Sequence, residues 1–305
     1  MIWLKNWQNL KGMVPSYRKK VLITGCSGQL GSTLRLYLSK YYEIFAFPHN
    51  TRIEGLLSPL DITNKERLET IVSEIAPDYI INCAAFTNVD KNETDKKRAY
   101  SVNVDGIKNI IAVTNKNIKI IHLSSDYIFD GTKELYKEDD PPNPLNYYGK
   151  VKLESENILR SSNRSFIIFR SSVIYNDSHQ SFYTWVYNSL LNNKKIKVVT
   201  DQISNPTWTW SLSEAIYKSI LNNLDGIFHY AGNDVVSRYE FALKIADKFS
   251  FNSDNIIPIM TGELNQIANR PLRSTLDSSK ISEILKINHP EMDYIINIFK
   301  DRINE

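Results

Sequence analysis

The stretch KVLITGCSGQLGSTLRLYL, residues 20–38, decides the fold of this chain. It opens on a mainly apolar run, residues 20–24, of the kind found in strands that are buried on both faces. Gly25, Gly28 and Gly31 follow, and the apolar residues after them recur at the three- and four-residue spacing of a helix. The stretch therefore predicts a strand, a glycine turn and a helix in direct succession.

A glycine turn in this position is typical of a dinucleotide-binding site. The first glycine permits the tight turn, the second lets the backbone approach a pyrophosphate, and the third lets the helix pack closely against the strand. The N–H groups at the start of the helix then bind the phosphates. The spacing here is G-x-x-G-x-x-G rather than G-x-G-x-x-G, and the alternative is that the glycines serve turn geometry alone.

The alternation of strand and helix continues along the chain. We expect strands at 20–24, 43–47, 78–84, 118–125, 165–172 and 226–232, and helices at 29–42, 64–77 (with Thr63 as a possible N-cap), 98–116 and from Tyr147 or Tyr148 onward. Repeated βαβ units with short connections predict a parallel sheet with helices on both faces. The expected fold class is therefore α/β, a Rossmann-type doubly wound parallel sheet with a smaller mixed α/β C-terminal substrate domain.

This pattern also suggests how the chain is divided. We expect an N-terminal extension over residues 1–19, a dinucleotide-binding domain over 20–175 and a mainly substrate-binding domain over 176–305. The strand at 226–232 is expected to return to the first domain. In the extension, apolar residues recur at helical spacing, which indicates packing on the chain itself or on a partner, with a membrane-surface role as the alternative.

Composition excludes several classes of protein. Hydrophobic residues make up 42% and charged residues 23%, as in ordinary globular chains, and the net charge of +3 is too small to indicate nucleic-acid binding. No apolar run approaches the roughly 18 residues that span a bilayer. Two cysteines imply no disulfide framework, so we expect a cytoplasmic protein. The five histidines lack metal-ligand spacing, and we expect no metal site.

The choice of dinucleotide is read at the end of the second strand. An acid there would bind the ribose 2′-hydroxyl of NAD. The segment FAFPHNTR has none, and it offers His49, Asn50 and Arg52 instead. This favours NADPH, with NADH as the alternative.

A second group of residues predicts proton transfer. Ser125 ends the strand expected at 118–125, and Tyr148 and Lys152 lie four apart in the next helix, so they share a face. A tyrosine titrates near about pH 10, and a neighbouring ammonium lowers that value. Tyr148 would then donate a proton to a carbonyl oxygen that Ser125 also binds, while Lys152 holds the nicotinamide ribose. By itself Y-x-x-x-K also occurs by chance, and we assign the competing phenol, Tyr147, to packing.

From about residue 20 to 280 the chain resembles the extended short-chain dehydrogenase/reductases, and within them the dTDP-4-dehydrorhamnose reductase family. The resemblance rests on many short motifs in the right order: TGCSGQLG, DITNKERLETIVSEIAPDYIINCAAFTNVDKNE, VNVDGIKN, HLSSDYIFDGT, YKEDDPPNPLNYYGKVKLE, FRSSVIY, DQISNPT, SRYEFA and NRPLRSTLD. It implies an oxidoreductase that uses NAD(P)H to reduce the 4-keto group of a nucleotide-linked 6-deoxy-4-ketohexose, for surface polysaccharide synthesis.

The resemblance also implies roles for individual residues. The catalytic set maps onto Ser125, Tyr148 and Lys152. The cofactor-binding residues, taken together with those argued above, are Gly25, Gly28, Gln29, Leu30, Gly31, Arg52, Asp61, Ile62, Ala84, Ala85, Phe86, Thr87, Tyr148 and Lys152. The substrate-binding residues are Ser125, Asp126, Val173 and Arg270. Asn103 is a candidate for fixing the backbone at a strand end, with a helix-surface amide as the alternative.

The chain departs from the family pattern at three places. The family's usual threonine is Ser125 here, which keeps the hydroxyl. A tryptophan expected near the sugar is Val173, so the identity of the sugar is open. Trp208 and Trp210 either rebuild that wall or pack in the core. Arg270 lies where the family binds the nucleotide diphosphate, with a surface salt bridge as the alternative.

Two other functions remain compatible with the sequence. An epimerase or dehydratase of a nucleotide sugar would keep the fold and retain its NAD without net consumption. A non-catalytic regulatory subunit, like that of methionine adenosyltransferase, would keep the fold to bind a partner. Family members often pair through helices, which suggests a homodimer.

Overall fold

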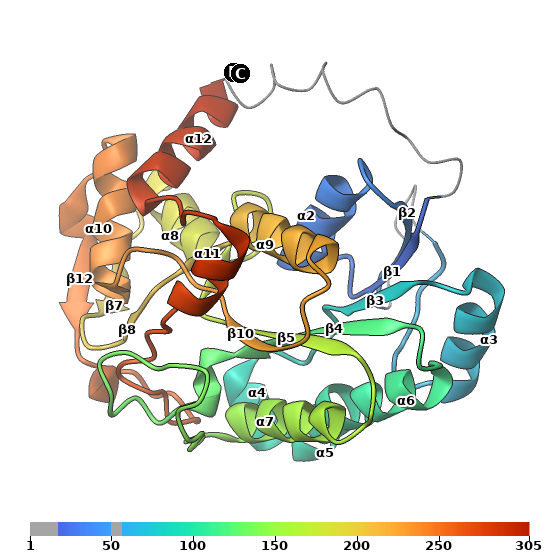
Figure 1. The fold of residues 1–305 in the computed structure, drawn as a ribbon. Coiled ribbons are helices and arrows are strands. Elements are labelled where there is room, and N and C mark those ends of the chain that lie inside the picture. The colour runs from blue at the N-terminus through green and yellow to red at the C-terminus, as the bar shows by residue number, and fades with distance from the viewer. Residues whose placement is uncertain (1–17, 50–56, 305) are drawn as a thin grey trace.

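A six-stranded parallel sheet forms the centre of the computed structural model, which describes residues 18–49 and 57–304 (Figure 1). The strand order is β10-β5-β4-β3-β1-β2, and every neighbouring pair is parallel. The bounds are β1 Lys20–Thr24, β2 Glu43–Phe47, β3 Tyr79–Asn82, β4 Lys119–Ser125, β5 Phe166–Ser171 and β10 Gly226–His229. The predicted α/β, doubly wound fold is confirmed, and β10 joins the main sheet beside β5.

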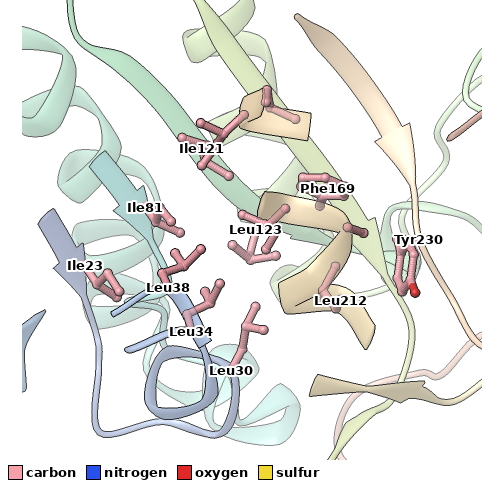
Figure 2. Close-up of a cluster of buried hydrophobic side chains, with 14 of the residues drawn as sticks. Ile23, Leu30, Leu34, Leu38, Ile81, Ile121, Leu123, Phe169, Leu212 and Tyr230 are labelled. Atoms are coloured by element: carbon pink, nitrogen blue, oxygen red, sulfur yellow. The ribbon is translucent and has the colours of Figure 1, made fainter. Parts of the chain in front are cut away.

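Helices cover both faces of this sheet (Figure 1). One face carries α2 (Gln29–Leu38), α9 (Thr209–Leu221) and α11 (Ser279–Leu285), and the other carries α3 (Lys65–Ile75), α6 (Gly106–Val113) and α7 (Tyr147–Arg160). Successive strand residues point to opposite faces. Ile23, Ile81 and Ile121 therefore pack against Leu34 and Leu212 of the first helix layer, as Figure 2 shows.

The second face has the complementary set of apolar residues. Leu22, Ile80 and Ile120 pack against α3 and α6 on that side. Two residues further along each strand, the same face bears polar side chains in place of apolar ones. The core thus ends where the strands approach their carboxyl ends, the edge at which ligands bind in such sheets.

Two helices differ from the sequence prediction, one in its N-cap and the other in its continuity. Helix α3 is capped by Asn64, which accepts the Arg67 N–H, and not by Thr63, whose hydroxyl donates to Asp61. The helix expected over 98–116 is divided into α5 (Lys96–Tyr100), a π-helical turn (Ser101–Asp105) and α6. Such turns are frequent at functional sites.

The C-terminal elements pack around a separate core. This core contains α8 (Phe182–Leu191), α10 (Arg238–Phe249), α12 (Met292–Asn304), β7 (Ile196–Val199) and β12 (Ile256–Ile259). Short strand pairs join it to the rest: β6 (Ile174–Tyr175) with β9 (Thr207–Trp208), and β8 (Ile203–Ser204) with β11 (Val236–Ser237). A short helix, α4 (Val89–Thr94), follows β3. The division of the chain at residue 175 stays a prediction.

Some expectations fall outside the structure. The amphipathic pattern in the N-terminal extension lies before the first described residue. Within residues 18–49 and 57–304, none of the helices has the length and apolar character needed to cross a bilayer.

Candidate active site

The glycine turn lies between β1 and α2, and packing explains two of its three glycines but not the third. Gly25 has a φ of +66°, and a Cβ atom on it would lie 2.7 Å from the nitrogen of Ala84. A Cβ atom on Gly31 would lie 2.8 Å from the Cα atom of Cys26. Protein packing thus requires both glycines. A Cβ atom on Gly28 would meet, among the described residues, only the Gly25 carbonyl oxygen at an ordinary 3.4 Å, so Gly28 leaves space for a ligand.

Neighbouring residues of the turn also bear on cofactor binding. The side-chain oxygen of Gln29 is buried and has no hydrogen-bond partner among the described residues. Its main-chain carbonyl accepts a hydrogen bond from Asn176 at 3.3 Å. Leu30 is 6% exposed and belongs to the core, so only its main chain is available to a phosphate. Arg52, expected at the ribose, lies outside the described residues.

The loop after β3 runs beside this turn. It contains the expected residues Ala84, Ala85, Phe86 and Thr87. Asn103, from the π-helical turn, accepts the Phe86 N–H at 3.0 Å and donates to the Phe86 carbonyl at 3.2 Å. Asn103 therefore fixes the backbone at this strand end. Asp61 accepts two hydrogen bonds from Thr63, and Ile62 is buried against Gly106.

Ser125, the last residue of β4, is held by its neighbours. Its hydroxyl donates to Asp126 Oδ1 at 3.0 Å and accepts the Tyr127 N–H at 3.1 Å. The other carboxylate oxygen of Asp126 accepts from the hydroxyls of Ser172, at 2.9 Å, and Ser274, at 2.5 Å. Burial raises the pKa of Asp126, and these three hydroxyls oppose the shift. Asp126 thus ties two strand ends to the C-terminal segment.

Tyr148 lies in the first turn of α7, and its ring packs edge-on against Tyr127, two residues after Ser125. Asn146 caps this helix by accepting the Gly149 N–H at 2.8 Å. Burial is the main reason that the pKa of Tyr148 is raised above 10, and the charge of Asp126 acts in the same direction. The nearby hydroxyl of Ser125 opposes the shift. The phenol therefore holds its proton at neutral pH, next to the serine hydroxyl expected to share its substrate oxygen.

Lys152 lies one turn further along α7 and is 2% exposed. Its ammonium donates to the Leu123 carbonyl of β4. Burial lowers the pKa of Lys152 to about 8, against the opposing charges of Glu156 and Cys83. The sequence predicted that this ammonium would lower the pKa of Tyr148, but that pKa is raised, because burial of the phenol outweighs the other influences on it.

The two remaining substrate candidates lie near the strand ends. Val173 follows β5 with a φ of +41°, which is rare for a β-branched residue, and its carbonyl accepts the Thr207 N–H at 3.1 Å. Strain of this kind is found at functional sites. Arg270 donates to Asp90 at 2.5 Å and to the Ala268 carbonyl at 2.7 Å. The salt-bridge alternative is thus present, and a diphosphate contact stays a prediction.

Packing decides the roles of three aromatic residues that the sequence had left open or assigned to packing. Trp208 packs edge-on against Phe299, and Trp210 packs edge-on against Tyr37, so both tryptophans serve hydrophobic clusters. Tyr147 packs beneath the ammonium of Lys96. No cluster of three or more metal-ligating side chains occurs in the described ranges 18–49 and 57–304.

The serines that hold Asp126 were missed by sequence reasoning. Ser172 lies in FRSS and Ser274 in RSTLD, 46 and 148 residues from Asp126. Both stretches were noted as motifs, but nothing local to them indicates a common partner. Only the packing of the C-terminal segment against the strand ends brings them together.

Comparisons with known proteins agree with this geometry. The family model described as the RmlD substrate binding domain matches residues 19–303. The dTDP-4-dehydrorhamnose reductase of Aggregatibacter actinomycetemcomitans is 36% identical over 283 residues, which cover 88% of this chain and 94% of that protein. The crystal structure of the dTDP-4-dehydrorhamnose reductase of Bacillus anthracis in complex with NADP has a TM-score of 0.87 and 30% identity, covering 94% of this chain and all of that one.

A further relative has a different role. The methionine adenosyltransferase 2 subunit beta of Xenopus tropicalis is 29% identical over 277 residues, which cover 87% of this chain and 82% of that protein. The sequence of this chain is thus similar both to reductases and to this subunit. The match over residues 19–303 and the identity to the reductases show that this chain belongs to the RmlD family, that of the dTDP-4-dehydrorhamnose reductases.

Proposed function

We propose that this chain uses NADPH to reduce the 4-keto group of a nucleotide-linked 6-deoxy-4-ketohexose. The observation that carries the proposal is that Ser125, the last residue of β4, and Tyr148, in the first turn of α7, lie together at the carboxyl edge of the sheet, with Ser125 among the groups that shift the pKa of Tyr148. Lys152 lies one helical turn from this pair, and Gly28 leaves ligand space at the neighbouring turn. Reductases of the same family, including one solved with NADP, support the reaction and the cofactor.

The residues have distinct roles in the proposed reaction. When bound, NADPH would supply the hydride for the carbonyl carbon and would itself be oxidised to NADP⁺. Tyr148 gives its proton to the carbonyl oxygen, so that the ketone becomes an alcohol, and the phenolate regains a proton from solvent. Ser125 binds the same oxygen after its hydroxyl rotates away from Asp126, which keeps its bonds to Ser172 and Ser274.

The residues around the glycine turn fit a dinucleotide. No side chain of the described residues caps the start of α2, and its first N–H groups together with the open space at Gly28 suit a pyrophosphate. The unpartnered oxygen of Gln29 offers a further polar contact. The end of β2 has no acid at Phe47 or Pro48 to favour NAD, and NADH remains the alternative cofactor.

The direct test measures loss of NADPH absorbance with a panel of nucleotide-linked 4-ketosugars. We expect stoichiometric NADPH consumption with at least one dTDP-linked member and conversion of its ketone to an alcohol. An epimerase or dehydratase would instead convert the sugar without net NADPH loss. Binding of a partner without turnover on any ketosugar would favour the regulatory alternative.

Gly28→Ala and Gly31→Ala should separate ligand space from packing. We expect Gly28→Ala to weaken NADPH binding at least about 10-fold with little change in the free energy of unfolding, since a Cβ there meets no tight contact. Gly31→Ala should lower the free energy of unfolding by about 1–3 kcal/mol, because its Cβ overlaps the turn. NADPH titration and urea unfolding check both. Wild-type affinity in Gly28→Ala would contradict the phosphate role.

The rate should fall as pH rises through about 8, because Lys152 loses its charge there. Its pKa is lowered from 10.5, so the ammonium is present below about pH 8 and lost above it. The folded state then binds fewer protons than the unfolded state between about pH 8 and 10.5, so this group makes stability rise with pH in that window. Unfolding driven by Lys152 therefore cannot explain the loss.

The measurement is the pH profile of kcat. Lys152→Arg serves as the comparison, because arginine stays charged throughout. We expect the alkaline limb near pH 8 to vanish in this variant, whatever rate it retains. A wild-type rate that is flat between pH 7 and 10 would contradict the assignment.

We also expect this chain to act as a homodimer in the cytoplasm. Sedimentation at micromolar concentration tests the assembly, and a strictly monomeric chain would contradict it.

A further inference from the structure

A row of polar side chains crosses the sheet beneath α7. Thr24, Asn82 and His122 are in register on the neighbouring strands β1, β3 and β4. Each lies two residues after an apolar residue of the core on that face, so all three point to the side that α7 covers. They are between 0% and 2% exposed. Burying three polar side chains in a row is costly unless they bond to one another.

The hydrogen bonds in this row all run in one direction. The Thr24 hydroxyl donates to Asn82 Oδ1 at 2.7 Å. That bond leaves the Asn82 amide N–H to face His122 Nδ1, at 3.2 Å, which therefore accepts. His122 Nε2 then carries the proton and donates to the Ser155 hydroxyl at 3.0 Å. Ser155 in turn donates to the main-chain carbonyl of Lys152 at 2.6 Å.

This series of hydrogen bonds ends at Lys152, at its main-chain carbonyl and beside its ammonium. Ser155 donates to the Lys152 carbonyl, and the Lys152 ammonium donates to the Leu123 carbonyl next to His122. With the proton of His122 on Nε2, the Lys152 ammonium 3.3 Å away is a second donor and makes no hydrogen bond with that nitrogen. At the other end of the series Thr24 directly precedes Gly25, the first residue of the glycine turn. Burial, followed by the charge of Lys152, holds the pKa of His122 well below 6.5, so the imidazole stays neutral. Successive hydrogen bonds of this kind polarise and rigidify one another.

We propose that His122 is a positioning residue: through Ser155 it fixes the turn of α7 that carries Lys152, in register with the glycine turn. This inference rests on the proposed reductase function, because it assigns Lys152 a place at the cofactor. Displacements of about 1 Å at a catalytic group cost up to about 100-fold in rate. This role goes beyond filling space in the core, since an apolar residue would fill the same space without making the hydrogen bonds.

Two substitutions of His122 distinguish the effect of its bond with Ser155 from the effect of its bond with Asn82. In His122→Gln the amide reaches the position of Nε2 and can still donate to Ser155. In His122→Asn the amide reaches only the position of Nδ1, so the bond with Asn82 is kept and the bond with Ser155 is lost. We expect His122→Gln to keep kcat within about 3-fold of wild type and His122→Asn to lose at least about 10-fold, with the KM for ketosugar nearly unchanged.

Ser155→Ala breaks the same series of hydrogen bonds one residue further on, at Ser155 itself. It should reproduce the loss in His122→Asn, and the double variant should lose no more than the worse single variant, because both remove the same link. Ser219→Ala is the matched control, since Ser219 is also fully buried and donates to a carbonyl of its own helix, α9. It should cost similar stability without affecting kcat.

The affinity for NADPH gives a second readout that needs no sugar. We expect Kd to rise several-fold in His122→Asn and Ser155→Ala but not in His122→Gln or Ser219→Ala. If the wild type showed no turnover but this pattern of Kd values held, the proposed function would be wrong and the positioning role would stand. Wild-type kcat and Kd in His122→Asn and Ser155→Ala, or losses that simply add in the double variant, would overturn the positioning role.

Discussion

Tyr148→Phe is expected to lower kcat by about 10²- to 10⁴-fold while leaving NADPH affinity within a few-fold of wild type. The range is the usual contribution of a positioned general acid. Phenylalanine keeps the ring, which packs edge-on against Tyr127 with centroids 6.1 Å apart. Only the hydroxyl is removed, and with it the proton that would reach the substrate oxygen.

The neighbouring tyrosine provides a matched control. Tyr147 differs from Tyr148 by one position in the same helix, and its ring contacts Lys96 instead of Ser125. Tyr147→Phe should therefore keep kcat within about 2-fold of wild type, since its hydroxyl has no assigned part in the proton transfer. The two variants are compared by steady-state kinetics with saturating ketosugar and by NADPH titration. Equal rates in Tyr148→Phe and Tyr147→Phe would remove Tyr148 from the mechanism.

The raised pKa of Tyr148 changes how this acid must be understood. A phenol that holds its proton more tightly is a weaker acid, so the proton moves only as negative charge develops on the substrate oxygen. The nearby Ser125 hydroxyl opposes the shift. Ser125→Ala should therefore be costly in kcat as well, and Ser125→Thr should not, because threonine keeps the hydroxyl.

The sequence predicts the fold because its signals are local. Continuous apolar strands and a glycine turn followed by helical spacing act within about 20 residues, and repeated βαβ units predict parallel pairing. The strand order β10-β5-β4-β3-β1-β2 was not predicted. The cap of α3 was misassigned by one residue. Thr63 and Asn64 both suit an N-cap, but Asn64 accepts the Arg67 N–H, while the Thr63 hydroxyl donates to Asp61.

The site is less accessible to such reasoning because its contacts are long-range. Y-x-x-x-K places Tyr148 and Lys152 on one helix face, but their pKa values depend on burial that no spacing reveals. The junction at Asp126 needs Ser274, which is 148 residues away. Likewise, a histidine in an apolar strand indicates a core residue, and only the strand register shows that His122 continues a row from Thr24.

A buried ion pair beneath the site should make the largest difference to stability. Glu156 of α7 is 0% and Arg170 of β5 is 2% exposed. Arg170 binds both oxygens of Glu156 at 2.8–3.2 Å. Its remaining donors reach the Glu138 carbonyl at 3.0 Å and His229 Nε2 at 3.3 Å. The pair therefore fastens α7, and the loop that contains Glu138, to the sheet.

Glu156→Gln should lower the free energy of unfolding by about 3–5 kcal/mol, because it leaves the Arg170 charge buried and uncompensated. Glu214→Gln is the control, since Glu214 forms a half-exposed pair with Lys218 at 2.8 Å and such pairs contribute about 0.3–0.5 kcal/mol. Urea unfolding of the three proteins gives the comparison.

The double variant Glu156→Leu with Arg170→Met distinguishes pairing from mere packing. Removing both charges eliminates the uncompensated guanidinium, so the double variant should be more stable than Glu156→Gln, although Glu138 and His229 lose a donor. Were the double variant the less stable of the two, the cost in Glu156→Gln would come from lost contacts. A loss below about 1 kcal/mol in Glu156→Gln would mean that water or the neighbouring His229 already compensates Arg170, and α7 would then owe its placement to its apolar face alone.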